Sequence, residues 1–179
     1  ITIIQQRSRF ILGRTRKYAL ELVKWAVSNG FAKLIVLAAA DSGFWAGDEV
    51  VYRKFFYTTR SPLDEEHLKL FSRLAVSQLS EVRADSIELF KTESSSPEQM
   101  VFPAARAGLL NKMHDLCQQM GVTALGIVLF CKEGYNVEEA ISMATMANTI
   151  LDIIPVSDSG SPVTWKAPPS WKSLMEEAL

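Results

Sequence analysis

Two uninterrupted apolar segments place the strongest constraint on the fold. Residues 34–40 and 124–131 each run for seven or eight positions without a charged side chain. A strand with one face in water alternates apolar and polar residues, whereas a strand covered on both faces is apolar throughout. The two segments therefore predict buried strands in a sheet that carries helices on both sides.

Helical patterns precede each of these strands. Residues 15–29 place polar side chains on one stripe and apolar side chains on the other, and Gly30 follows as a stop. Residues 103–120 repeat apolar side chains at intervals of three and four, and Gly121 follows. Because residues 2–7 predict a further strand, the first helix connects two strands in one parallel crossover unit.

Further elements complete the predicted arrangement. Residues 50–58 predict another strand, Ser61 and Pro62 open a second helix, and Asn136 caps a fourth with Glu139. Alanines in that fourth helix predict close packing on the sheet. We therefore expect an α/β fold of three layers, with a mixed, mostly parallel central sheet flanked by helices.

The composition predicts a single domain. The chain has 179 residues, of which 48% are hydrophobic and 22% charged, close to the average for a globular domain. We expect one α/β domain over residues 1–179, a mobile loop at about residues 82–99 around Ser94, Ser95 and Ser96, and a C-terminal strap at residues 162–172.

Charge and cysteine content exclude several classes of partner. Nineteen basic and twenty acidic residues give a net charge of −1, so we expect neither a nucleic-acid nor a membrane partner. No segment approaches the length of a membrane-spanning helix. Cys117 and Cys131 both lie in apolar segments, which favours reduced thiols in an intracellular protein over a disulfide framework.

One loop offers the best alternative for catalysis. Asp41, Ser42, Gly43, Asp48 and Glu49 follow the first buried strand, where ligands bind in open parallel sheets. The same residue types also occur in ordinary turns, and no nucleophile elbow, phosphate loop or dinucleotide motif supports an active site.

The two histidines provide no catalytic pattern either. His67 follows three acidic residues, and His114 precedes Asp115 on a helix, where sequence neighbours do not face one another. We therefore expect no catalytic, cofactor-binding or metal-binding residues, no cofactor and no enzyme activity.

Aromatic side chains predict a surface that contacts other proteins. Trp165 and Trp171 flank Pro168 and Pro169, which hold the chain extended. Two tryptophans on such a strap must dock on the same chain or on a partner. Phe44 and Trp45 lie in a loop of small and polar residues and form a second candidate for partner contact.

Three motifs resemble the proteasome assembly chaperone 2 family. The closing pattern of Trp165, Lys166, Pro168, Ser170, Trp171 and Lys172 is similar to the C-terminal signature of that family. Residues 133–140, with the sequence Glu-Gly-Tyr-Asn-Val-Glu-Glu-Ala, resemble its Glu-Gly-Asp-Asn-Ile-Pro-Asp-Ala turn. Residues 34–39 after a basic helix resemble its Val-Ile-Val-Leu-Ser-Ser strand.

The resemblance implies a specific role. It implies a chaperone, cytoplasmic and nuclear, that pairs with proteasome assembly chaperone 1 as a heterodimer. The pair binds the α subunits of the 20S proteasome and promotes formation of the α ring. The alternatives are an enzyme on the same architecture, which resembles nucleoside phosphorylases, and a generic α/β interaction module.

The chain departs from the family pattern at both ends. The family carries several N-terminal strands and a Gly-Asn-Val-Gly turn that have no counterpart in this sequence, so we expect the chain to be N-terminally incomplete. Some relatives end in a hydrophobic-Tyr-any motif, whereas this chain ends in Ala178 and Leu179. The terminal carboxylate of Leu179 remains a candidate contact to a lysine of an α subunit.

Overall fold

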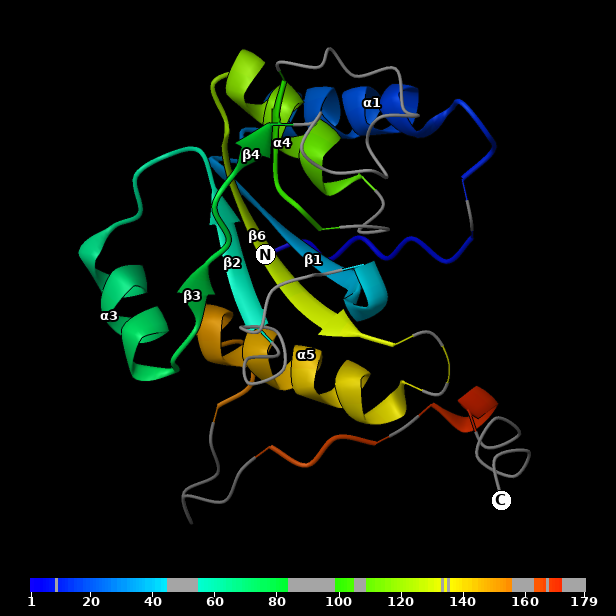
Figure 1. Cartoon of the computed structure of the whole chain (residues 1–179), viewed down its shortest axis with the longest axis vertical. Helices are drawn as coiled ribbons and strands as arrows, with labels where there is room; N and C mark the ends of the chain where they lie inside the picture. The colour runs from blue at the N-terminus through cyan, green and yellow to red at the C-terminus, as the bar shows by residue number, and fades with distance from the viewer. Residues whose placement is uncertain are drawn as a thin grey trace.

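A central strand organises the sheet. The structure, a computed structural model, describes residues 1–8, 10–44, 55–83, 99–104, 109–132, 134, 136–155, 163–166 and 168–171. Strand β6 (Thr123–Cys131) pairs in parallel with β1 (Lys33–Asp41) along nine positions and antiparallel with β2 (Phe55–Thr59) (Figure 1). The outer strand β3 (Ser77–Gln78) pairs in parallel with β2, so the order is β1-β6-β2-β3. The predicted mixed, mostly parallel sheet is confirmed.

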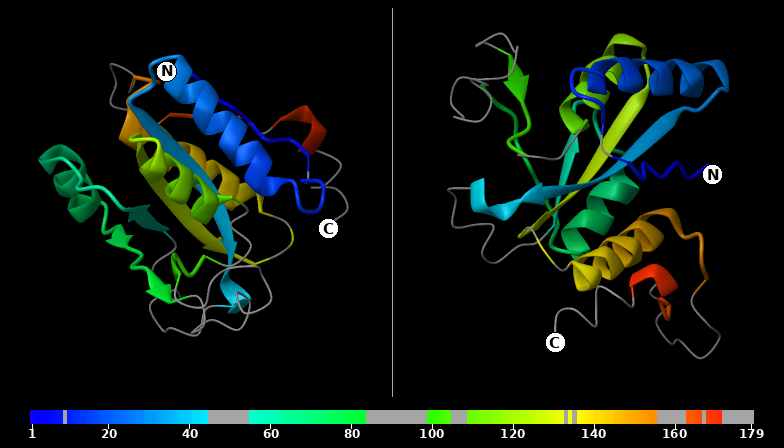
Figure 2. Two further views of the ribbon diagram at one scale, coloured as in Figure 1. Left: turned by 90° about the horizontal axis from the view of Figure 1, so that it is seen from above. Right: turned by 90° about the vertical axis from the view of Figure 1, so that its right-hand side faces the viewer.

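Helices cover both faces of this sheet. On one face, α1 (Thr15–Ser28) and α4 (Leu110–Gln119) pack against Leu34 of β1 and Ala124 of β6. On the other face, α3 (Glu65–Arg73) and α5 (Val137–Leu151) pack against Ile35 and Leu125 (Figures 1 and 2). Adjacent residues of a strand point to opposite faces, which is why both segments are apolar throughout. The three-layer arrangement is therefore confirmed.

Short elements complete the described part of the chain. Strands β4 (Val82–Arg83) and β5 (Met100–Val101) form an antiparallel pair, and the 3-10 helices η1 (Ser42–Phe44) and η4 (Pro169–Trp171) each make one turn. The predicted loop at residues 82–99 thus begins with β4 and is followed by β5, and residues 84–98 lie outside the described part. None of the described helices is long and apolar enough to cross a membrane.

Glycine marks two helix ends as predicted. Gly30 and Gly121 have φ angles of +72° and +70°, a backbone conformation that favours glycine after a helix.

The start of α4 is different from the prediction, because the helix begins at Leu110 and not near Pro103. Asn136 precedes α5, but its side chain donates to the carbonyl oxygen of Lys132 at 3.0 Å and does not cap the helix.

The strand predicted at residues 2–7 is not present. Residues 1–8 carry no strand hydrogen bonds in the structure, and Ile1 and Ile3 are exposed. A β-strand requires a hydrogen-bonded neighbour in addition to a suitable sequence, and no described strand pairs with this segment. Of the strand predicted at residues 50–58, the part that the structure describes lies in β2, and residues 45–54 lie outside the described part.

Gly126 allows α4 to approach the middle of β6. A Cβ atom at this position would lie 2.1 Å from Thr58 Oγ1 and 2.7 Å from Leu110 Cδ1. Both distances are far below van der Waals contact, so a side chain here must displace its neighbours. The sheet and α4 therefore fit together only because position 126 has no side chain.

We expect Gly126→Ala to lower the free energy of unfolding by about 2 kcal/mol or more, because the added methyl group overpacks this contact. Chemical denaturation measures the change. The double variant Gly126→Ala/Thr58→Ala removes the nearest clashing atom and should recover part of the loss. Additive effects of the two substitutions would contradict this explanation.

Candidate functional site

Five residues are predicted to contact partners, and the structure describes the side chains of two of them. Trp165 and Trp171 are both half-buried. The described part of the C-terminal strap that carries them runs along α5 (Figure 1). Phe44 ends η1, but its side chain lies outside the described part, as do Trp45 and Leu179 entirely. The strap is therefore the part of the predicted surface that can be analysed in detail.

After α5 the chain turns back, and the side chain of Asn148 stabilises this turn. Asp152 follows the helix with φ +46° in the left-handed region. The side-chain amide of Asn148 donates to the carbonyl oxygen of Ile154 at 2.9 Å, and its oxygen accepts from the Ile154 backbone N–H at 2.8 Å. These two bonds fix the direction in which the chain leaves α5.

Trp165 attaches the strap to the middle of α5. Its indole Nε1 donates a hydrogen bond of 2.8 Å to Thr145 Oγ1. The Thr145 hydroxyl donates in turn to the Ile141 carbonyl oxygen at 3.0 Å, which fixes its orientation as an acceptor. The indole group thus has its polar atom satisfied while its ring covers part of the helix surface.

Trp171 lies at the other end of the strap. It closes the short helix η4, and its backbone N–H donates to the Pro168 carbonyl oxygen at 2.9 Å. The predicted stiff strap therefore contains a turn around the two prolines and is not extended throughout. Trp171 is half-buried.

The helix beneath the strap is unusually apolar for a surface helix. Residues 140–151 contain no charged side chain, although Val137 is the one buried residue among those described in α5. Met143, Met146 and Ile150 pack toward the sheet. The predicted packing of the alanines is wrong for Ala140, which is exposed. A half-exposed helix with twelve consecutive uncharged residues, lying beside an aromatic strap, is suited to contact with another protein.

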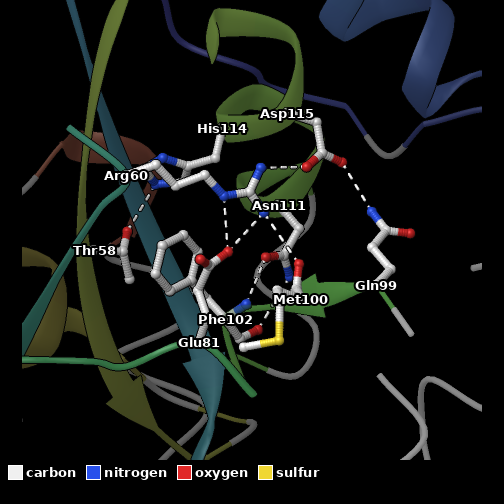
Figure 3. Close-up of polar contacts among 9 residues, drawn as sticks. All are labelled: Thr58, Arg60, Glu81, Gln99, Met100, Phe102, Asn111, His114 and Asp115. Carbon is white, nitrogen blue, oxygen red and sulfur yellow. Dashed lines mark hydrogen bonds and ion pairs between the residues drawn. The ribbon is translucent and has the colours of Figure 1, made fainter. Parts of the chain in front are cut away.

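A second group of polar residues lies on the opposite side of the sheet from α5 (Figure 3). Arg60 follows β2, and its guanidinium group donates to Glu81 Oε1 at 2.7 Å, to Asp115 of α4, and to the Met100 carbonyl oxygen at 3.1 Å. It also lies 5.7 Å from the centre of the Phe102 ring. Arg60 therefore connects β2, α4 and the β4-β5 pair.

Neighbouring polar groups complete this cluster. Gln99 donates to the second oxygen of Asp115 at 3.1 Å, and Asn111 exchanges two hydrogen bonds with the backbone of Phe102. An open pocket of about 520 Å³ lies beside the cluster and includes Thr59 and Gln118 in its lining. Arg60, Glu81 and Asp115 also line this pocket, but their charges are paired with one another, so the arrangement stabilises the fold.

His114 is buried beneath this cluster and is neutral at physiological pH. Its Nε2 lies 2.9 Å from Thr58 Oγ1, and its ring packs 4.7 Å from that of Phe102. Burial lowers the pKa of His114 to about 4, with a further contribution from the positive charge of Arg60. Asp115 faces Arg60 and not His114, so the prediction that these two neighbours form no dyad is confirmed.

The other candidates for chemistry also have structural roles. Asp41 Oδ1 accepts from the Gly43 backbone N–H at 2.8 Å, which stabilises the turn, whereas Asp48 and Glu49 lie outside the described residues. His67 Nδ1 lies 2.5 Å from Asp64 Oδ1, as its acidic neighbours predicted. Hydrogen bonds from His67 lower the pKa of Asp64 to about 2.

Neither thiol has the character of a nucleophile. Burial raises the pKa of Cys117 to about 11 and, with Glu139 and Asp41, also raises that of Cys131. Among the described residues, no group of three histidine, cysteine or acidic side chains could hold a metal ion.

The sequence did not predict the roles of Arg60 and Thr145, because no spacing rule connects residue 60 with 115 or residue 145 with 165.

We expect His114 to make the protein less stable in acid. The unfolded chain binds a proton at a pKa near 6.5 and the folded chain only near 4, so stability falls as the pH drops between these values. The loss attributable to His114 is on the order of 3 kcal/mol. Denaturation curves of the unmodified protein and His114→Gln at pH 7 and pH 4.5 measure the difference.

Thr58→Val is the matched control. Burial, and not the hydrogen bond to Thr58, is the main cause of the low pKa of His114. This variant should keep the dependence of stability on pH. An equally steep dependence in His114→Gln would show that another group is responsible.

We expect Arg60→Met to lower the free energy of unfolding by about 2–4 kcal/mol, because Glu81 and Asp115 then lose their partner in a largely buried position. Lys69→Met provides the control, since its pair with Glu65 is exposed and should contribute less than about 0.5 kcal/mol. Urea denaturation compares the two variants, and similar effects would contradict a stabilising role of the cluster.

Comparison with known sequences gives full-length similarity to one group of proteins. The chain is 23% identical over 179 residues to proteasome assembly chaperone 2 of Danio rerio, and 22% and 23% identical to the proteins of that name from Mus musculus and Homo sapiens. Each match covers 100% of this chain and 66% of the relative, so the chain spans about two thirds of the relatives' length. No protein-family model matches the chain.

Two solved structures share the fold. PbaA of Pyrococcus furiosus, described as an archaeal homolog of proteasome-assembly chaperone, matches 95% of this chain with a TM-score of 0.52 and 17% identity. A protein of unknown function from Thermoplasma acidophilum matches 96% with a TM-score of 0.53 and 10% identity. The matches cover 58% and 54% of those chains. The resemblance to the proteasome assembly chaperone 2 family, predicted from three short motifs, thus extends over the full length of this chain.

Proposed function

We propose that this chain acts as a chaperone in the assembly of the 20S proteasome. The relatives that match it along its full length are all named proteasome assembly chaperone 2, and PbaA shares its fold. The finer proposal is a heterodimer with proteasome assembly chaperone 1 that binds α subunits and promotes formation of the α ring. Cytoplasm and nucleus are the compartments in which this role would be carried out.

The observation that carries the proposal is the surface of α5 and its strap. The Trp165 indole group is bonded to Thr145, beside twelve helical residues without charge. Aromatic side chains with few charges are typical of the centre of protein interfaces. The polar residues that could serve catalysis are instead paired with one another, as in the cluster of Arg60, Glu81 and Asp115. This distribution supports a binding protein and not an enzyme.

The direct test is co-expression with proteasome assembly chaperone 1 and the α subunits of the 20S proteasome. Size-exclusion chromatography followed by mass spectrometry identifies the complexes. We expect an equimolar complex of the two chaperones that retains α subunits. A complex without α subunits would favour a generic interaction module, and a monomer that binds neither would contradict the proposal.

We expect Trp165→Ala to weaken capture of the partner by at least tenfold, because it removes an aromatic contact and releases the strap from α5. Affinity measurements on the co-expressed complex test the effect. Leu68→Ala is the control, since Leu68 is also a partly exposed apolar residue but lies on α3. Circular dichroism should show that both variants remain folded, and equal binding by both would contradict a role for the strap.

A further inference from the structure

The polar pocket beside Arg60 carries an excess of negative charge. Among the described residues that line it, Glu81 and Asp115 are carboxylates and Arg60 alone is basic. One guanidinium group therefore pairs with two carboxylates, and one negative charge stays unbalanced. The side chains of Glu81 and Asp115 are only 25% and 18% exposed, so water and salt screen this charge less than on an open surface. The pocket thus favours a ligand of positive charge.

The carboxylates can still accept hydrogen bonds. Arg60 Nε and Nη2 both lie 2.7 Å from Glu81 Oε1, so Glu81 Oε2 can accept from a ligand (Figure 3). Asp115 accepts from Arg60 at Oδ1 and from Gln99 at Oδ2, which uses two of the roughly four lone pairs of a carboxylate. Gln99 makes its bond through Nε2, so its amide oxygen is a further acceptor. These acceptors suit a cation that carries several N–H donors.

The end of α4 adds to the preference for a cation. Gln118 lines the pocket from the last turn of this helix, and Asp115 lies about one turn before it. The carboxyl end of a helix carries partial negative charge, and a lysine or arginine there is stabilising. The last turn of α4 contains no basic residue. A cation in the pocket would supply the charge that the helix itself lacks.

Met100 makes the pocket suited to a cation on an apolar stem. Its side chain lines the pocket and is 45% exposed, whereas its backbone carbonyl oxygen accepts from Arg60. Lysine and arginine cover apolar surface with their methylene groups while their charged ends lie in polar surroundings. Since no three ligating side chains among the described residues could hold a metal ion, these features favour a basic side chain over a metal.

We propose that this pocket binds the side chain of a lysine or arginine from a partner protein. The ammonium or guanidinium group donates to Glu81, Asp115 and the amide oxygen of Gln99, and the stem lies on Met100. α4 covers the opposite face of the sheet from α5. The pocket is therefore a contact site separate from the surface of α5 and its strap.

An NMR titration of the full chain with short peptides tests this proposal. The probes have the sequence Gly-Ser-Xaa-Ser-Gly with blocked ends, where Xaa is lysine, arginine or the uncharged norleucine. We expect a basic peptide at millimolar concentration to shift the amide signals of Gln99, Asp115 and Gln118. It should bind at least about tenfold more tightly than the norleucine peptide, because its hydrogen bonds to charged groups are absent there. Equal shifts with all three peptides, or none with either basic peptide, would overturn the proposal.

Opposite charges at one position test the sign of the ligand. Gln118 lines the pocket and is exposed, so Gln118→Lys and Gln118→Glu should both remain folded, as circular dichroism can verify. We expect Gln118→Lys to weaken binding of the basic peptide by at least about threefold and Gln118→Glu to strengthen it. Equal affinities, or tighter binding by Gln118→Lys, would contradict a cation site. The measurement needs no proteasome component, so its result is independent of the proposed function.

Discussion

The close approach of three elements at Gly126 determines how the rest of the molecule is arranged. Thr58 of β2, Leu110 and His114 of α4 all come within 3.3 Å of the position that a Cβ atom would occupy on β6. A helix can lie this close to a sheet only where the strand beneath it has no side chain. This contact sets the distance between α4 and the sheet, and thereby the position of Asn111, His114 and Asp115 on α4.

The polar cluster follows from that contact. Because α4 lies close to β2, Asp115 reaches Arg60 and His114 reaches Thr58, although the residues are 55 and 56 positions apart in sequence. The cluster joins β2, α4 and β5 at a place where the sheet has only the short strand β3 beyond β2. Its charges are paired and its histidine is neutral, so its chemistry serves the fold. Because burial lowers the pKa of that histidine, we expect the fold to lose stability in acid.

The sequence predicted those features that depend on local pattern. Residues 34–40 and 124–131 lie in β1 and β6, and Gly30 and Gly121 follow their helices, because burial and helix termination each leave a local signature. The prediction of a strand at residues 2–7 was wrong, because strand pairing depends on a neighbour that no local pattern specifies. Arg60 was missed for the same reason, since its partners come from distant segments. Trp165 was identified from the aromatic and proline residues around it, but Thr145, which accepts its hydrogen bond, was not.

The two apolar surfaces of the molecule differ in what they can recognise. The α5 surface offers side chains, among them the indole group of Trp165, and side chains distinguish one partner from another. The β1 edge offers backbone groups, which are the same for every strand and therefore accept almost any extended segment. The α5 surface lies on one face of the sheet and not at its edge, so a segment that paired with β1 would leave α5 accessible.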